Sequence, residues 1–98
     1  MWILQSAADP DGDSLTFRLA EGAIKTVGRA PRADFVVDAA LVSRLHCRLT
    51  AGDDTVNVVD LDSTNGTYIN DQRVQQGSLA SGDRLRVGRV EFALERQS

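Results

Sequence analysis

Residues 59–70 read Val-Asp-Leu-Asp-Ser-Thr-Asn-Gly-Thr-Tyr-Ile-Asn, and this stretch is the clearest indication of the fold class. Its Asn65-Gly66 pair lies between two short segments in which apolar residues recur at strand spacing. A type I′ turn needs positive φ at both central residues, so the pair predicts a tight β-hairpin turn. The stretch therefore predicts strands joined by turns.

The same alternation recurs on both sides of this stretch. Gly, Asp and Ser separate the segments, as in the turns predicted at Glu21-Gly22, Gly52-Asp53-Asp54, Ser81-Gly82-Asp83 and Gly88-Arg89. Closely spaced runs of period two predict an all-β fold, either a sandwich or a barrel, and residues 39–45 are expected to form a loop. The predicted strands cover residues 2–5, 15–19, 23–27, 35–37, 47–51, 55–60, 68–69, 85–87 and 90–94.

Length and composition predict one domain over residues 1–98, because 98 residues can bury a single core. A net charge of −3 argues against a non-specific nucleic-acid binder, which needs a broad basic face. No apolar run approaches the roughly 20 residues that span a bilayer, so no membrane association is predicted. The single cysteine, Cys47, has no internal partner, which favours the cytoplasm or another reducing intracellular compartment.

Two patterns suggest metal sites, and both are rejected. Residues 9–13 read Asp-Pro-Asp-Gly-Asp, like the start of a calcium loop, but Ser14 and Ala20 stand where the EF-hand pattern needs Gly and Glu. A solvated turn is the better reading. His46 and Cys47 are adjacent, so on a strand they point to opposite faces, and there is no second His or Cys. We therefore predict no metal and no cofactor.

A hydrolase triad of Ser43, His46 and a carboxylate such as Asp60 is the enzymatic alternative. It requires a nucleophile within reach of its base, together with an oxyanion hole. No nucleophile elbow surrounds Ser43, so the sequence predicts no catalytic residues and no enzyme activity.

Three other segments carry groups suited to holding a phosphate. They are Gly28-Arg29, Ser43-Arg44-Leu45-His46 and Asp62-Ser63-Thr64-Asn65-Gly66-Thr67. Taken singly, each is an ordinary turn with solvated side chains. In a sandwich, however, loops far apart in the sequence converge at one end. Guanidinium, hydroxyl and backbone N–H donors gathered there would bind a phosphorylated residue.

These segments, taken in order, resemble the forkhead-associated (FHA) domain family. The resemblance runs from about Thr26 to Leu94 and combines several motifs that are weak alone and specific together. The motifs are Val27-Gly28-Arg29-Ala30-Pro31-Arg32-Ala33-Asp34-Phe35, Val42-Ser43-Arg44-Leu45-His46, residues 59–70 and Leu79-Ala80-Ser81-Gly82-Asp83-Arg84-Leu85-Arg86-Val87-Gly88.

The resemblance implies an antiparallel β-sandwich of about eleven short strands that binds phosphothreonine peptides through loops at one end. By position, Arg29 and Ser43 would bind the phosphate, and Arg44 would add a contact to it. Thr64 would shape the pocket for the phosphothreonine methyl group. Asn65 would hydrogen-bond the peptide backbone.

The resemblance also implies architectural and specificity residues. The architectural residues would be Gly28, His46, Gly66 and Asn70, with His46 bracing the loops and Gly66 permitting the turn. Leu41 stands where some members carry a basic residue, which favours an apolar residue three places after the phosphothreonine. The candidate specificity positions are Arg32, Leu41 and the 71–78 loop with Arg73.

The resulting prediction is a phosphothreonine-dependent peptide- and protein-binding module, a signalling adaptor downstream of a Ser/Thr protein kinase. The chain begins at its first predicted strand, so we expect it to bind a phosphorylated partner in trans rather than a tail of its own. The alternative is a structural or oligomerisation domain that binds independently of phosphate. Substitution of Arg29 separates the two, because only the first depends on it.

Overall fold

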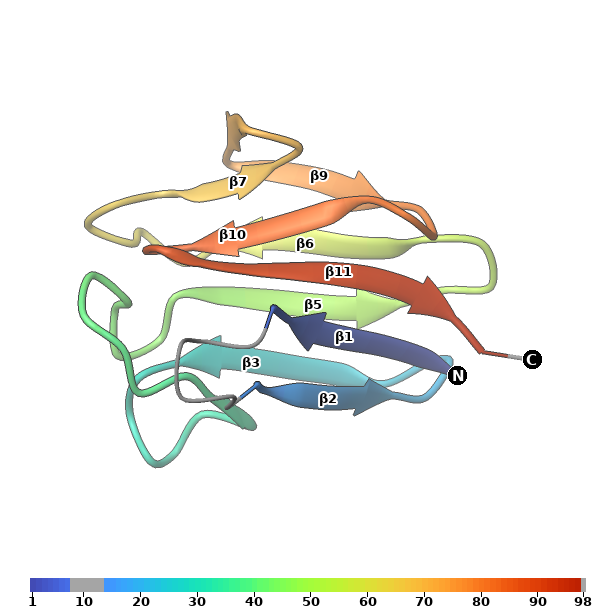
Figure 1. Ribbon diagram of the computed structural model, residues 1–98, viewed down its shortest axis with the longest axis horizontal. Helices are drawn as coiled ribbons and strands as arrows, with labels where there is room; N and C mark the ends of the chain where they lie inside the picture. The colour runs from blue at the N-terminus through green and yellow to red at the C-terminus, as the bar shows by residue number, and fades with distance from the viewer. Residues whose placement is uncertain (8–13, 98) are drawn as a thin grey trace.

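The structure, a computed structural model, describes residues 1–7 and 14–97. It holds eleven strands in two facing sheets, as Figure 1 shows. The strands are β1 (Trp2–Ser6), β2 (Thr16–Leu19), β3 (Ile24–Gly28), β4 (Phe35–Val36), β5 (Cys47–Ala51), β6 (Val56–Asp60), β7 (Thr67–Ile69), β8 (Gln72–Val74), β9 (Gln76–Leu79), β10 (Arg84–Val87) and β11 (Val90–Arg96). The prediction of an all-β sandwich is confirmed. The pattern at residues 9–13 lies outside the described residues.

The two sheets follow from the alternation in the sequence. One sheet has the order β2-β1-β11-β10-β7-β8, and the other has the order β4-β3-β5-β6-β9. In β5 and β6 every second residue is buried, and Leu49 pairs with Val58 across the strands with neither side chain exposed. Burying such apolar surface between the sheets is the main stabilising contribution to this fold.

One strand pair departs from the expected antiparallel order. β3 and β4 are parallel, with Val27 opposite Phe35. The Phe35 ring stacks on Phe17 of β2, with ring centroids 4.6 Å apart. This stacking joins the edges of the two sheets, because β2 and β4 belong to different sheets.

The prediction of a hairpin at Asn65-Gly66 is wrong. This pair connects β6 of one sheet to β7 of the other, so the chain crosses the sandwich there. φ is positive at Gly66 (91°) but not at Asn65. Glu21-Gly22 likewise connects different sheets, whereas Gly52-Asp53-Asp54 and Gly88-Arg89 do join paired strands.

A two-residue turn of the predicted kind lies five residues after Asn65-Gly66 in the chain. Asn70 (φ 49°) and Asp71 (φ 69°) separate β7 from β8, and Ile69 pairs with Gln72 across the turn. Positive φ at both central residues is the signature of a type I′ hairpin. Residues 71–78 are therefore not the predicted loop, because they contain β8 and most of β9.

The loops that follow β3, β4 and β6 gather at one end of the sandwich, at the left in Figure 1. The β10–β11 turn lies at the same end, and the two chain termini lie at the opposite end. No helix among the described residues is long and apolar enough to cross a membrane.

Candidate functional site

Backbone hydrogen bonds join the loop at residues 29–34 to the loop at residues 37–46. The Arg29 N–H donates to the Ser43 carbonyl at 2.9 Å, and the Ala30 N–H donates to the Arg44 carbonyl at 3.1 Å. The Arg29 Nε also donates to the Val42 carbonyl at 3.1 Å. This last bond fixes the guanidinium over the 37–46 loop, while its terminal nitrogens remain available to a ligand.

Side chains join the 37–46 loop to the third loop, residues 61–66. The Ser43 hydroxyl oxygen accepts a hydrogen bond from the Thr64 N–H at 3.1 Å. The Asn65 side-chain amide donates to the Leu41 carbonyl at 3.1 Å. Leu41 has φ of 71°, which is unusual for a non-glycine residue, and this bond helps to hold it there.

His46 is fully buried beneath these loops. Its Nδ1 accepts a hydrogen bond from the Ser43 N–H at 3.0 Å. Nε2 therefore carries the ring proton and donates it to the Gly66 carbonyl at 2.8 Å. One ring thus holds together the two loops from which Ser43, Thr64 and Asn65 project.

Asp60 anchors the third loop from below and is only 7% exposed. One of its oxygens accepts hydrogen bonds from the hydroxyls of Ser63 (2.5 Å) and Thr67 (2.7 Å), and the other accepts the Ser63 N–H at 3.2 Å. Burial alone would raise the pKa of this carboxyl, but the donated hydrogen bonds outweigh it and hold the pKa below its usual value.

Replacing Asp60 should therefore cost stability in a pH-dependent way. A lowered folded-state pKa means that the stabilisation is complete above the unfolded value of about 4 and is lost as pH falls through the folded value. Asp60→Asn should lower the free energy of unfolding by about 2 kcal/mol at pH 7, and by less at pH 3. Urea unfolding at both pH values measures this. Asp53→Asn, on the exposed β5–β6 turn, is the control, and a deficit independent of pH would contradict the assignment.

Glycines allow two close approaches at this end. A Cβ on Gly28 would overlap the carbonyl oxygen of Arg44, so only glycine lets the 37–46 loop lie against the end of β3. Gly66 has positive φ, and a Cβ there would lie 2.7 Å from the Arg73 Nε. Arg73, a predicted specificity residue on β8, thus packs over the third loop.

The three loops enclose an open pocket, which we call the loop pocket. Four of the five predicted phosphothreonine-binding residues line it together. Asp38 also lines the loop pocket and adds a carboxylate to it. The sequence did not predict this residue, because nothing distinguishes an aspartate at this position from an ordinary loop residue. The lining residues are Arg29, Asp38, Ala39, Ala40, Leu41, Val42, Ser43, Thr64 and Asn65.

Arg44, the fifth predicted residue, does not line the loop pocket. It lies in a neighbouring depression with the predicted specificity residue Arg32, and we call this depression the arginine hollow. Arg29 is the one residue that lines both. The arginine hollow is formed by Arg29, Ala30, Pro31, Arg32 and Arg44.

Asn70 is the one predicted architectural residue that the structure places away from the loop pocket. It lies at the β7–β8 turn, where its side chain donates to Asp83 at 3.1 Å and accepts the Arg84 N–H at 2.9 Å. These bonds fasten the turn to the start of β10. The turn lies away from the end at which the recognition loops gather in Figure 1.

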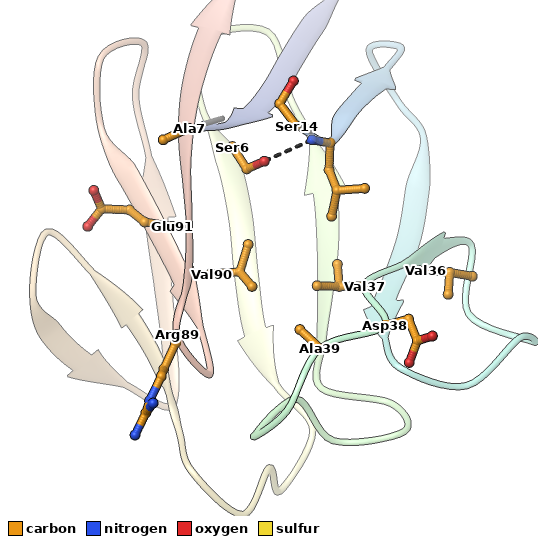
Figure 2. Close-up of a pocket in the computed structure, with 11 residues that line it drawn as sticks. Ser6, Ala7, Ser14, Val36, Val37, Asp38, Ala39, Arg89, Val90 and Glu91 are labelled. Atoms are coloured by element: carbon orange, nitrogen blue, oxygen red, sulfur yellow. Dashed lines mark hydrogen bonds between the residues drawn. The ribbon is translucent and has the colours of Figure 1, made fainter. Parts of the chain in front are cut away.

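A mostly apolar hollow of about 550 Å³ adjoins the loop pocket and shares Asp38 and Ala39 with it. Figure 2 shows Val37 and Ala39 facing Val90, with Arg89 and Glu91 at the rim. It lacks the gathered donors of the loop pocket, and we assign it no ligand.

The site offers hydrogen bonds and positive charge but no activated nucleophile. Both His46 ring nitrogens are engaged by backbone groups, so His46 cannot accept the Ser43 proton in this arrangement. Asp60 is engaged by Ser63 and Thr67 instead of His46. Burial, followed by the charge of Asp60, raises the pKa of the Cys47 thiol to about 12, which leaves it unreactive.

Comparison with known proteins extends this description. Residues 25–88 match the model of the FHA domain family. The glycogen accumulation regulator GarA of Mycobacterium tuberculosis is 39% identical over 71 residues, which cover 72% of this chain and 44% of GarA. The FHA domain-containing protein FhaA of the same organism is 38% identical over 82 residues, or 84% of this chain and 15% of FhaA. The chain thus spans less than half the length of either relative.

Solved structures agree. The FhaA FHA domain, crystallised in complex with the intracellular domain of Rv3910, matches with a TM-score of 0.83 at 35% identity, covering 97% of this chain and all of that one. A structure from an analysis of phosphothreonine-dependent FHA domain interactions matches at 0.80 and 31%, covering 100% and 99%. The sequence motifs, the two-sheet fold and the loop geometry therefore have one explanation: this chain belongs to the FHA domain family.

Proposed function

We propose that residues 1–98 form one binding module that recognises phosphothreonine in a partner protein, in trans, downstream of a Ser/Thr protein kinase. The observation that carries the proposal is the loop pocket itself. It places a guanidinium, a hydroxyl and a carboxamide from three separate loops around one opening. Phosphothreonine-dependent interactions are also the subject of one of the similar structures.

Each lining residue has a separate role in this proposal. Arg29 and Ser43 bind the phosphate oxygens, because a guanidinium fork and a hydroxyl both donate to them. Thr64 borders the space for the threonine γ-methyl. Asn65 keeps its amide bonded to the Leu41 carbonyl and presents its side-chain oxygen to a backbone N–H of the peptide. Arg44, which follows Ser43 in the chain, adds a side-chain or backbone contact to the same phosphate.

We also propose that the module has no catalytic activity, because the engaged His46 leaves Ser43 without a base. The free, buried Cys47 thiol supports a location in the cytoplasm or another reducing intracellular compartment. The competing function, a phosphate-independent structural or oligomerisation domain, uses the same fold, but it gives no role to the arginine side chain that borders the pocket.

The test measures, by fluorescence anisotropy, how tightly this domain binds degenerate peptide libraries centred on phosphothreonine, phosphoserine or threonine. Phosphothreonine should bind best, and phosphoserine should bind about tenfold more weakly because an unfilled methyl site forfeits about 1–3 kcal/mol. Equal binding to all three libraries would instead support the phosphate-independent domain.

Asp38 gives this proposal a prediction of its own. Its carboxylate lines the loop pocket and would repel a phosphate dianion. Asp38→Asn should therefore strengthen phosphothreonine-peptide binding by about threefold in 0.1 M salt, with a smaller gain in 1 M salt. Anisotropy titrations measure this, with the distant Asp53→Asn as the charge-matched control. A weaker or unchanged affinity would show that Asp38 does not face the bound phosphate.

A further inference from the structure

Asn65-Gly66 is the one Asn-Gly pair in the chain, and it lies in the lining of the loop pocket instead of in a hairpin. The other asparagines, Asn57 and Asn70, are followed by valine and aspartate. Asparagine loses its side-chain amide most readily before glycine, because glycine has no Cβ to hinder attack by its backbone nitrogen. Asn65 is also exposed. The loop pocket therefore contains the chain's most reactive asparagine.

The reaction is deamidation, and water is its only co-reactant. The Gly66 backbone nitrogen attacks the side-chain carbonyl carbon of Asn65, and a new C–N bond closes a succinimide ring. The bond to the side-chain nitrogen breaks, and that nitrogen leaves as ammonia with the proton lost by Gly66. Water then opens the ring at either carbonyl. The product carries aspartate or isoaspartate at position 65.

Hydrogen bonds in the folded protein engage both reacting groups. The Gly66 N–H donates to the Ser63 hydroxyl oxygen at 3.0 Å, and the Ser63 hydroxyl itself donates to the Asp60 carboxylate at 2.5 Å. The Asn65 side-chain amide donates to the Leu41 carbonyl at 3.1 Å. The Gly66 nitrogen must lose its proton and the Asn65 side chain must turn before attack, so these bonds have to break first. We call them the loop lock.

We propose that Asn65 is a self-modification site, whose deamidation inactivates the loop pocket, and that the loop lock confines the reaction to moments when the third loop opens. A carboxylate at position 65 cannot donate to the Leu41 carbonyl, and it repels a phosphate dianion. Isoaspartate also adds a methylene group to the backbone of the loop. The loss of binding rests on the proposed function, whereas the modification itself does not.

The first test compares folded wild-type protein with the same protein unfolded in urea, at mildly alkaline pH, by mass mapping of the peptides that contain each asparagine. Deamidation at Asn65 should be at least about tenfold faster in the unfolded protein, because the folded loop must open locally before it reacts. Asn57 and Asn70 should react more slowly than Asn65 when all three are unfolded. Equal rates in folded and unfolded protein, or a faster reaction at Asn57 or Asn70, would overturn the proposal.

A pair of variants tests whether the loop lock or overall stability restrains the reaction. Folded Ser63→Ala lacks the acceptor for the Gly66 N–H, and it should deamidate about threefold faster or more. Gly22→Ala places a side chain on a left-handed turn residue before β3, which lowers overall stability without touching the third loop. Its rate should stay within about twofold of the wild type, because local opening does not require global unfolding. Equal acceleration in both variants would overturn the role of the lock.

Hydrogen exchange tests the loop lock in the wild type, without any variant that could fail to fold. The Gly66 amide is buried and bonded, so its hydrogen should exchange at least about tenfold more slowly than in an open peptide of residues 61–68. Exchange as fast as in the peptide would mean that no lock exists.

Binding measurements on the same samples test the inactivation. The deamidated fraction, purified from aged wild type, and the variant Asn65→Asp should both bind a phosphothreonine peptide at least about tenfold more weakly than fresh protein. Wild-type affinity in the deamidated fraction would overturn the inactivation. If fresh protein binds no phosphopeptide, the proposed function fails, while the mass data still decide whether Asn65 is the modification site.

Discussion

Arg29→Ala is expected to weaken phosphothreonine-peptide binding by about 100-fold while leaving the fold intact. Removing one partner of a charge-assisted contact costs about 2–5 kcal/mol, because the phosphate is then left with fewer donors. Arg29 is exposed, and its one side-chain hydrogen bond to the residues that the structure describes goes to the Val42 carbonyl, so little stability depends on it. Isothermal titration calorimetry of the variant, with circular dichroism as a check of folding, measures both effects.

Two matched variants sharpen this prediction. Arg29→Lys keeps the charge but loses the planar fork, and it should bind at least about tenfold more weakly than the wild type. Arg48→Ala removes an exposed arginine from β5, and it should bind within about twofold of the wild type because screening weakens distant charges. If Arg29→Ala also stayed within that range, the guanidinium would have no part in binding.

Gly28→Ala is expected to have the largest effect on stability. The new Cβ would overlap the Arg44 carbonyl oxygen and would lie 2.9 Å from the Leu45 Cα, and both are backbone atoms. The carbonyl of Gly28 also accepts the Val37 N–H, so β3 cannot easily shift away. Overpacking of this kind costs about 1–3 kcal/mol or more, and we expect a loss of about 3 kcal/mol in the free energy of unfolding.

The control for this variant is Gly22→Ala. Gly22 has φ of 84° but open space around its Cβ position, so alanine meets only the left-handed backbone penalty of about 1–2 kcal/mol. Urea unfolding compares the two variants. A Gly28→Ala protein as stable as Gly22→Ala would mean that the 37–46 loop can move aside, and its phosphopeptide affinity would then fall because Ser43 lies on that loop.

The sequence predicted the strands with strong alternation and missed those without it. β8 and β9 consist mostly of exposed polar residues (Gln72, Arg73, Gln76 and Ser78), and only Leu79 at the end of β9 is fully buried. The Asn-Gly pair was misleading because tertiary contacts decide how such a turn is used. Gly66 leaves room for the Arg73 side chain, and its carbonyl accepts the hydrogen bond from His46. The type I′ turn is formed by Asn70-Asp71 instead.

The candidate site was predictable in its residue types but not in its detailed geometry. Loop convergence placed Arg29, Ser43, Thr64 and Asn65 at one opening, as the resemblance implied. Sequence spacing could not show that Arg44 lines a depression with Arg32 and not the loop pocket, since that depends on how two loop backbones pair. Nor could it show that Asp60 supports the third loop from within, because its partners become neighbours only after the loop closes.

The most direct test of the central claim is an NMR titration of the ¹⁵N-labelled domain with one peptide in its phosphothreonine and unphosphorylated forms. We predict that the phosphopeptide shifts the Arg29 side-chain Nε–H and the backbone amides of Ser43, Thr64 and Asn65. The β5–β6 turn at the far end of the sandwich should stay unchanged, and the unphosphorylated peptide should shift nothing. Equal shifts with both peptides, or shifts confined to residues outside the three loops, would contradict the account.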